Sequence, residues 1–206
     1  MRYADLVEMV DESVAGSAAG IYAAAPAPPP GGSVLMMVGL PGAGKSLLIH
    51  HLQALLPVIV VSSDQVRTLA LAQPGYSLEE VDAIYDLCHA VIERRLAQGQ
   101  RVVFDATNLL RRRRQMLRRT AAQSGAVVAV CHVTASVADI RQRLQARHSQ
   151  TRRPGDLSDA GWSVYELLQN QFEPLQLPHL TLNTSVAPPD QLARQLRDYW
   201  LAQETI

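Results

Sequence analysis

Residues 39–46 have the sequence Gly39-Leu40-Pro41-Gly42-Ala43-Gly44-Lys45-Ser46, which fits the pattern G-x-x-x-x-G-K-S. An apolar run at 34–38 precedes this stretch, and leucines at helical spacing follow it from Lys45 to about Leu55. Between a buried strand and a helix, this pattern forms a glycine-rich loop that surrounds a phosphate chain. We therefore expect a phosphate-binding loop here.

Each part of the loop has a task that suits its residue type. Gly42 and Gly44 let backbone N–H groups converge on a phosphate chain, and the helix N-terminus adds the positive end of its dipole. We expect the ammonium group of Lys45 to reach the β- and γ-phosphates of ATP and the hydroxyl of Ser46 to bind Mg²⁺. The residues expected to bind the nucleotide are Gly39, Leu40, Pro41, Gly42, Ala43, Gly44, Lys45, Ser46 and Leu47.

The choice of cations along the chain supports a special role for Lys45. Of the 19 lysines and arginines, 18 are arginines, and the one lysine is Lys45. A codon preference can explain the arginines, but at this position a compact ammonium group is kept where a planar guanidinium does not substitute for it.

Length and composition bound the organisation of the chain. With 206 residues, 48% of them hydrophobic, it is long enough for one well-buried domain and short for two. Residues 3–18 can form an amphipathic helix, but the prolines at 26–30 indicate a linker after it. We expect an N-terminal extension with a proline-rich linker over 1–30, packed on the domain or not, and one domain over 31–206.

The charges are unevenly distributed although the formal net charge is zero. Residues 94–153 contain fourteen arginines against two acids, Asp105 and Asp139. This basic region indicates either an anionic ligand beyond ATP or a solvated surface.

Two further features concern the compartment. Cys88 and Cys131 lie in apolar patterns without metal-ligand spacing, so we expect reduced thiols in the core. No apolar run approaches the roughly 18 residues of a membrane span, and no signal-like segment opens the chain. We expect a soluble, cytoplasmic protein without a membrane partner.

Apolar runs alternate with helical patterns along the rest of the chain, which predicts a parallel sheet with helices on both faces. In such a sheet, ligands bind beyond the carboxyl ends of the strands, so residues that follow different strands become neighbours. The predicted strands are 34–38, 58–61, 101–105, 126–133 and 180–183, and the predicted helices are 45–55, 77–98, 111–124, 137–148, 158–172 and 190–203.

Two residues beyond the second strand suit the acceptor of a phosphoryl group. The carboxylate of Asp64 can take a proton from a hydroxyl, and Arg67, one helical turn later, can bind an acceptor phosphate through two hydrogen bonds. The alternative is that Asp64 only caps the helix that it opens.

The third predicted strand ends in Asp105, in the manner of a Walker B element. Its carboxylate can hold Mg²⁺ or orient the acceptor. Thr107 and Asn108 follow as acceptor contacts or as turn formers.

Arginines near residues 143–153 are candidates for stabilising the charge of the transition state. Arg147 and Arg152 are the preferred ones, and Arg143 and Arg153 are further candidates, although a basic loop also contains solvated arginines. The run Arg111–Arg114 fits a solvated helix face, or else a contact with a polyanionic acceptor.

Taken together, residues 39–46, Ser63-Asp64-x-x-Arg67, 105–108 and the arginines of 143–153 resemble the P-loop kinases grouped around phage and bacterial 5′-polynucleotide kinases. The chain resembles the zeta-toxin kinases and small-molecule phosphotransferases more distantly. The resemblance spans 34–183 and implies a P-loop NTPase fold with an arginine-bearing helical lid, which makes 31–206 a P-loop kinase domain. Gln65 departs from the charged residue that these kinases usually have beside the base.

The resemblance also implies roles for single residues. Lys45 and Ser46 would bind ATP and Mg²⁺, Asp64 would be the general base toward a 5′-hydroxyl, and Arg67 would contact the acceptor phosphate. Asp105 would help to shape the acceptor site, and residues 147–153 would cover the β- and γ-phosphates.

We therefore expect an ATP- and Mg²⁺-dependent kinase whose acceptor is the 5′-hydroxyl of single-stranded DNA or RNA. A small-molecule or nucleotide-sugar kinase is the nearest alternative. An ATPase or ATP-binding protein without kinase activity, or a basic RNA-binding module, is a rival from another class.

Overall fold

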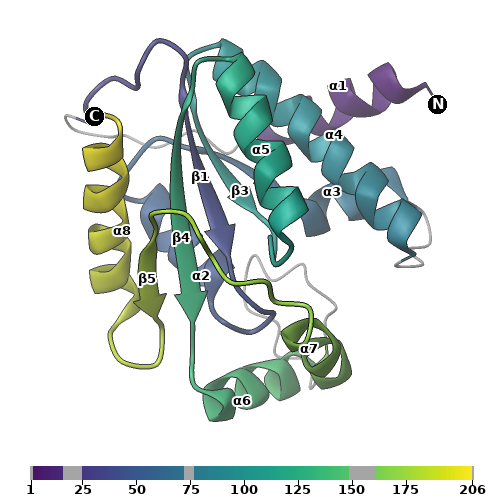
Figure 1. Cartoon of the computed structure of the whole chain (residues 1–206), viewed down its shortest axis with the longest axis vertical. Coiled ribbons are helices and arrows are strands. Elements are labelled where there is room, and N and C mark those ends of the chain that lie inside the picture. The colour runs from purple at the N-terminus through teal and green to yellow at the C-terminus, as the bar shows by residue number, and fades with distance from the viewer. Residues whose placement is uncertain (1, 16–24, 72–76, 149–160, 206) are drawn as a thin grey trace.

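The computed structural model describes residues 2–15, 25–71, 77–148 and 161–205, without the side chains of Ala15, Arg147 and His148. Within these ranges the chain forms an all-parallel sheet with the strand order β2-β3-β1-β4-β5 (Figure 1). The strands are β1 (Ser33–Val38), β2 (Ile59–Ser62), β3 (Arg101–Asp105), β4 (Val127–Thr134) and β5 (Leu180–Asn183). The predicted parallel sheet is thereby confirmed.

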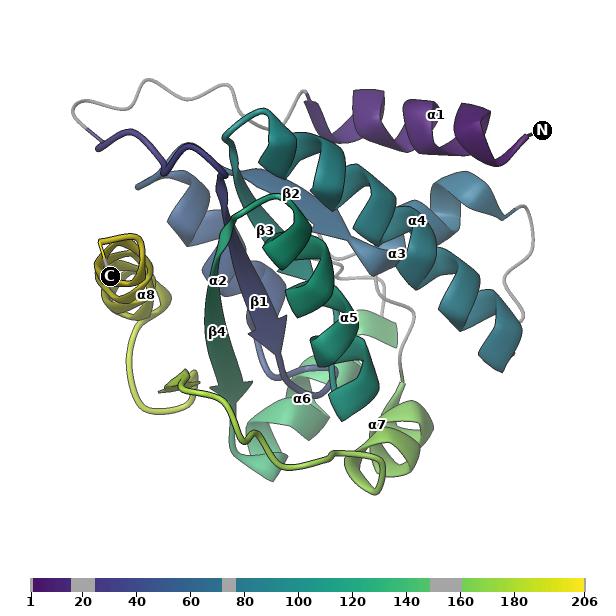
Figure 2. The same cartoon turned by 45° about the horizontal axis from the view of Figure 1, so that its top comes forward.

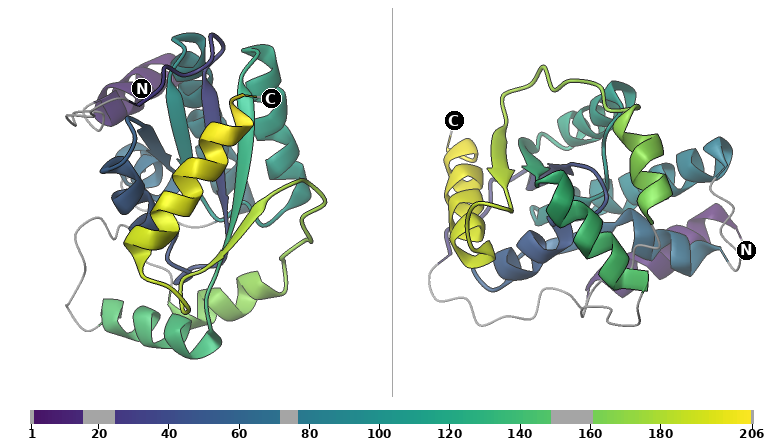
Figure 3. Two further views of the ribbon diagram at one scale, coloured as in Figure 1. Left: turned by 90° about the vertical axis from the view of Figure 1, so that its left-hand side faces the viewer. Right: turned by 90° about the horizontal axis from the view of Figure 1, so that it is seen from below.

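Helices cover both faces of the sheet, as predicted. Helices α2 and α8 pack on one face, α4 and α5 pack on the other, and α6 and α7 lie beyond the carboxyl ends of the strands (Figures 1 and 3). The helices are α1 (Tyr3–Ala15), α2 (Lys45–Gln53), α3 (Ser63–Ala70), α4 (Leu78–Ala97), α5 (Arg111–Gln123), α6 (Val137–His148), α7 (Trp162–Gln169) and α8 (Pro189–Gln203).

The central strand β1 shows why the sequence builds two cores. Successive side chains of a strand point to opposite faces. Val34, Met36 and Val38 accordingly join the core under α4 and α5, whereas Leu35 and Met37 join the core under α2 and α8. All six residues of β1 are buried, as expected for a strand covered on both faces. The loop that follows β1 therefore starts from a rigid support.

The two cysteines occupy the cores, as predicted. Cys88 and Cys131 are fully buried free thiols, and burial raises the pKa of both. No helix in the described ranges is long and apolar enough to cross a membrane.

Helix α1, the first element of the N-terminal extension, packs against the rest of the protein. It packs along α4 and also contacts β2 and α3 (Figure 2). Val7, Val10 and Val14 are buried in the core under α4. Beside them, the Arg95 side chain donates to Asp11 Oδ1 and to the Asp11 carbonyl oxygen, each at 2.6 Å. Helix α1 of the extension therefore packs on the domain.

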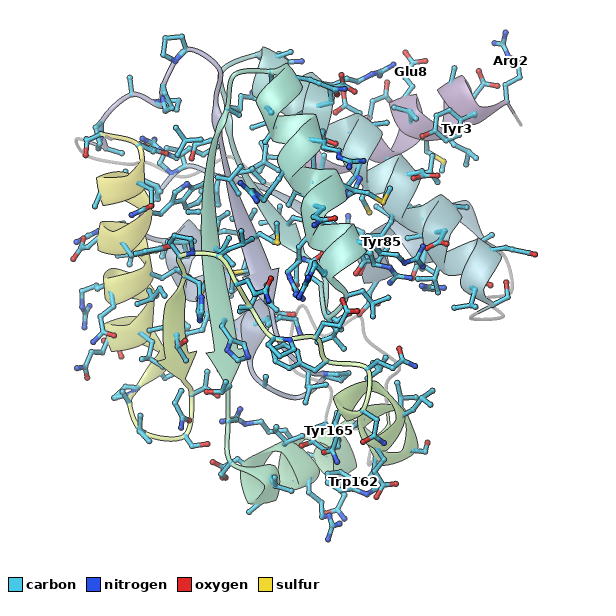
Figure 4. The ribbon with its side chains drawn as sticks, in the orientation of Figure 1. Arg2, Tyr3, Glu8, Tyr85, Trp162 and Tyr165 are labelled. Atoms are coloured by element: carbon cyan, nitrogen blue, oxygen red, sulfur yellow. The ribbon has the colours of Figure 1, made fainter. Side chains whose placement is uncertain are left out.

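Replacing Asp11 with alanine is expected to destabilise the protein by about 3 kcal/mol, because the Arg95 guanidinium would stay buried without its carboxylate. Chemical denaturation measures this loss. Glu8→Ala is the matched control, because Glu8 is exposed on the same helix (Figure 4) and such a change shifts stability by less than about 0.5 kcal/mol. Equal midpoints for the two variants would show that α1 does not dock in solution.

Candidate active site

The phosphate loop connects β1 to α2, and its glycines are required by geometry. Gly42 and Gly44 have φ angles of 79° and 98°, which favour glycine. A Cβ atom on Gly44 would lie 3.1 Å from the Thr184 side chain, and one on Gly42 would lie 3.0 Å from Ile140. Gly44 is also the N-cap of α2 and has no side chain that could occupy the N–H groups of the first turn. Those donors are thus placed as an anion site requires.

Lys45, the first residue of α2, folds back over the loop. Its Nζ atom donates to the carbonyl oxygens of Gly39, at 2.9 Å, and of Leu40, at 3.2 Å. The Gly39 N–H in turn donates to the Thr107 carbonyl oxygen at 3.0 Å. The ammonium group is thus held at the loop, and the loop is held by the segment that follows β3.

Ser46 and Asp105 meet at the position expected of a metal site. The Ser46 hydroxyl donates to Asp105 Oδ2 at 2.9 Å, although 59 residues separate them. A hydroxyl and a carboxylate are the hard oxygen ligands that Mg²⁺ prefers. The described residues contain no group of three or more His, Cys, Asp or Glu side chains that could hold a metal ion by themselves. The pair therefore fits a Mg²⁺ ion that takes its other ligands from phosphates and water.

Asp64 lies at the start of α3, directly beyond β2. The N-cap of this helix is Ser62, whose hydroxyl accepts from the Gln65 N–H, so the alternative role of Asp64 as the cap is wrong. β2 pairs with β3 with Ser62 opposite Asp105, and the Ser63 hydroxyl lies 3.5 Å from the Asp105 carbonyl oxygen. The half-buried Asp64, which follows Ser63, therefore lies at the same edge of the sheet as Asp105. Its role as the base stays a prediction.

Arg67 is placed differently from a free phosphate-binding residue. It is 7% exposed and forms an ion pair with Glu80 of α4, through Nη1. An acceptor phosphate would have to share or replace Glu80. The predicted contact between Arg67 and the acceptor stays a prediction.

The segment after Asp105 holds the phosphate loop and the end of β1 in place. Asn108 is fully buried with a φ angle of 49°, and its Nδ2 atom donates to the Met37 carbonyl oxygen of β1 at 2.8 Å. The predicted substrate contact of Asn108 is therefore wrong in this arrangement, because the side chain is enclosed by protein. Thr107 is half-buried and contacts the loop through its carbonyl oxygen. Its acceptor contact stays a prediction.

Helices α6 and α7, together called the α6–α7 insert, pack directly on the phosphate loop. Ile140 and Leu144 of α6 and Tyr165 of α7 form a small core with Leu40 of the loop. The rings of Trp162 and Tyr165 stack with centroids 4.7 Å apart (Figure 4). The insert and the loop therefore have a shared apolar contact.

Arg143 of α6 fastens this contact. Its guanidinium donates to the Gly42 carbonyl oxygen at 3.2 Å, to Thr184 Oγ1 at 2.8 Å and to the Thr184 carbonyl oxygen at 3.2 Å. Thr184 Oγ1 also donates to the Ala43 carbonyl oxygen at 2.8 Å. Sequence reasoning missed Thr184, whose only signal is a hydroxyl directly after the last strand. The Arg147 side chain, Arg152 and Arg153 lie outside the described residues.

The arginines of the basic region that the structure describes do not form one solvated face. Arg101 is paired with Glu204, and Arg112 and Arg113 are paired with Asp82. Arg113 and Arg114 are 9% and 2% exposed, so the expectation of a solvated helix face is wrong for the second half of the run Arg111–Arg114. The buried guanidinium groups of Arg101, Arg113 and Arg114 serve the fold.

Comparison with solved structures shows the same fold. The APS kinase CysC of Mycobacterium tuberculosis, in complex with AMPPNP and APS, has a TM-score of 0.64 and 19% identity, with 83% of this chain and 98% of that chain covered. Kti12 of Chaetomium thermophilum, in complex with ADP-AlF3, has a TM-score of 0.61 and 19% identity, with 82% of this chain and 99% of that chain covered. A gluconokinase from Sinorhizobium meliloti has a TM-score of 0.57 and 18% identity, with 85% of this chain and 95% of that chain covered. These neighbours confirm the P-loop NTPase fold but do not single out polynucleotide kinases.

Sequence comparison gives the family. No curated protein matches the chain. The family model AAA_33, described as an AAA domain, matches residues 34–175, which include the phosphate loop, Asp64 and Asp105. Because the match spans more than half of the chain, this protein belongs to the AAA_33 family of AAA domains.

Proposed function

We propose that this protein is an ATP- and Mg²⁺-dependent kinase that transfers the γ-phosphate to a hydroxyl group. The observation that supports this most directly is the 2.9 Å contact between Ser46 Oγ and Asp105 Oδ2 at the start of the loop helix. Asp64 lies beyond the neighbouring strand, two residues after the Ser62–Asp105 register pair. A phosphate cradle, an oxygen pair for Mg²⁺ and a further carboxylate are the parts that phosphoryl transfer needs.

Each residue has a defined task in this proposal. Lys45 and the loop N–H groups bind and orient the β- and γ-phosphates. Ser46 and Asp105 would hold Mg²⁺, which neutralises phosphate charge when bound. Asp64 accepts the proton of the acceptor hydroxyl while the oxygen of that hydroxyl bonds to the γ-phosphorus. The bond from the γ-phosphorus to the β–γ bridging oxygen breaks, so that ADP leaves with the electron pair. Arg147 and Arg152, in and after α6 along the sequence, would stabilise the charge of the transition state.

A small hydroxyl compound is the acceptor that the described residues favour. Arg113 and Arg114 are buried, and Arg67 is paired with Glu80, so the arginines expected to bind a polynucleotide are engaged within the protein. Two structural neighbours, the APS kinase and the gluconokinase, are named for small acceptors. The 5′-hydroxyl of single-stranded DNA or RNA is the second candidate, supported by the exposed Arg111 and Arg112 at the start of α5.

Incubation with γ-labelled ATP and Mg²⁺ tests both acceptors in parallel. The panel contains polyols, sugar acids and nucleosides on one side, and single-stranded oligonucleotides with 5′-hydroxyls on the other. Label in a small compound supports the proposal, and label in the oligonucleotides selects the second candidate. Loss of ATP without label in any acceptor would identify an ATPase instead. A Lys45→Met preparation controls for contaminating kinases.

A further inference from the structure

Arg114, in the first turns of α5, is buried, and its guanidinium group binds backbone carbonyl oxygens. Its Nη1 atom donates to the carbonyl oxygens of Asn108, at 2.9 Å, and Leu109. Its Nη2 atom donates to the carbonyl oxygens of Glu173, at 2.9 Å, and Pro174, at 3.2 Å. One guanidinium group thus joins the loop after β3 to the connection between α7 and β5.

The connection from α7 to β5 is built to receive this contact. The Glu173 N–H donates to the Leu109 carbonyl oxygen at 3.2 Å, and the Glu173 carboxylate accepts from the Arg111 N–H. Leu110, the N-cap of α5, has no side-chain cap of its own, so Glu173 supplies an acceptor and a negative charge to a helix that begins with four arginines. The connection crosses in front of β4 and passes below the lower end of α5 (Figure 1).

The other segment that Arg114 holds leads to the phosphate loop. Asn108, whose carbonyl oxygen binds Arg114, donates its side-chain amide to Met37. Thr107, the preceding residue, accepts from the Gly39 N–H at 3.0 Å. The Gly39 carbonyl oxygen in turn accepts from Lys45 Nζ at 2.9 Å. A continuous series of hydrogen bonds, joined through the backbones of Asn108 and Gly39, therefore connects Arg114 with the ammonium group of the loop.

We propose that Arg114 is a positioning residue, which fixes the α7–β5 connection and the loop 106–110 against the phosphate loop and thereby sets nucleotide affinity and transfer rate. Arg114 is 2% exposed and its guanidinium donates to backbone carbonyl oxygens of the protein. The rate depends on the proposed kinase function, whereas the affinity depends only on nucleotide binding. Arginine is required because its donors lie in a planar fork that spans two pairs of carbonyls, whereas the three donors of lysine share one nitrogen.

Arg114→Lys tests this role against Arg101→Lys. Arg101 is buried as well and donates through Nε and Nη2 to Glu204, but it stands at the amino end of β3, away from the loop. We expect both variants to lose thermal stability. Only Arg114→Lys should raise the Kd for Mg-ADP and lower kcat/KM, each about 10-fold, since a misplacement of about 1 Å can cost about 10²-fold.

Amide hydrogen exchange provides a readout that does not need transfer. In Arg114→Lys, exchange should rise at the N–H groups of Glu173 and Gly39, and in Arg101→Lys it should not. Binding of Mg-ADP is measured at a temperature well below the melting temperatures of both variants. If Arg114→Lys then binds Mg-ADP as tightly as Arg101→Lys does, the positioning role is refuted. If the wild type phosphorylates no acceptor, the kinase proposal fails, while the exchange and Mg-ADP measurements still decide the role of Arg114.

Discussion

Replacing Lys45 with methionine is expected to lower phosphoryl transfer at least about 10²-fold to 10³-fold, the loss that follows removal of one group that stabilises transition-state charge. The ammonium group is held at the loop by the carbonyl oxygens of Gly39 and Leu40. Methionine has a similar length but no charge, so it cannot neutralise the oxygens of the transferring phosphate. Steady-state rates with the acceptor that the labelling panel identifies measure the loss.

Thermal unfolding with and without Mg-ATP separates the two functions of Lys45. Its hydrogen bonds also brace the loop, so the variant is expected to melt somewhat earlier without ligand. The decisive quantity is the rise in melting temperature on adding ATP, because a ligand that binds only the folded state stabilises it by mass action. That rise should largely disappear. Lys45→Arg keeps the charge and should recover little of it, since a planar fork does not replace a point charge there. An unchanged rise in Lys45→Met would place the nucleotide elsewhere.

The features that the sequence predicted correctly depend on local patterns. The strand, loop and helix around residues 34–55 follow from apolar runs and glycine spacing alone. The meeting of Ser46 with Asp105 also followed, because the carboxyl ends of parallel strands share one edge of the sheet. The alternation of strands and helices determines the topology of the sheet. The topology in turn determines which residues meet at the carboxyl ends of the strands.

The features that the sequence did not predict depend on distant partners. Asn108 and Arg114 are polar residues in a polar stretch, which favours solvent exposure, yet each is buried against backbone carbonyls. Those carbonyls belong to segments distant in sequence, so no local pattern marks them. Thr184 was missed for the same reason, since its partners are the loop, β4 and Arg143. A run of arginines can therefore indicate internal bracing as well as an anionic partner.

Replacing Asp64 with asparagine is expected to reduce kcat about 10²-fold to 10⁴-fold, the usual contribution of a general base. Asparagine is nearly isosteric and does not disturb the cap of α3, because Ser62 provides that cap. The affinity for ATP should stay close to that of the wild type, since Asp64 faces the acceptor in this proposal. Single-turnover rates and a separate ATP-binding measurement test the two halves of the expectation.

Two further carboxylates make the result specific to Asp64. Asp82→Asn is the control for charge, because Asp82 lies on α4 and pairs with Arg112 and Arg113. This variant is expected to keep kcat near the wild-type value. Asp105→Asn distinguishes base from metal ligand. Its loss should be recovered in part by a higher Mg²⁺ concentration, whereas the loss in Asp64→Asn should not respond, because an absent proton acceptor cannot be replaced by more metal. Full activity of Asp64→Asn together with a Mg²⁺-insensitive loss in Asp105→Asn would transfer the role of base to Asp105.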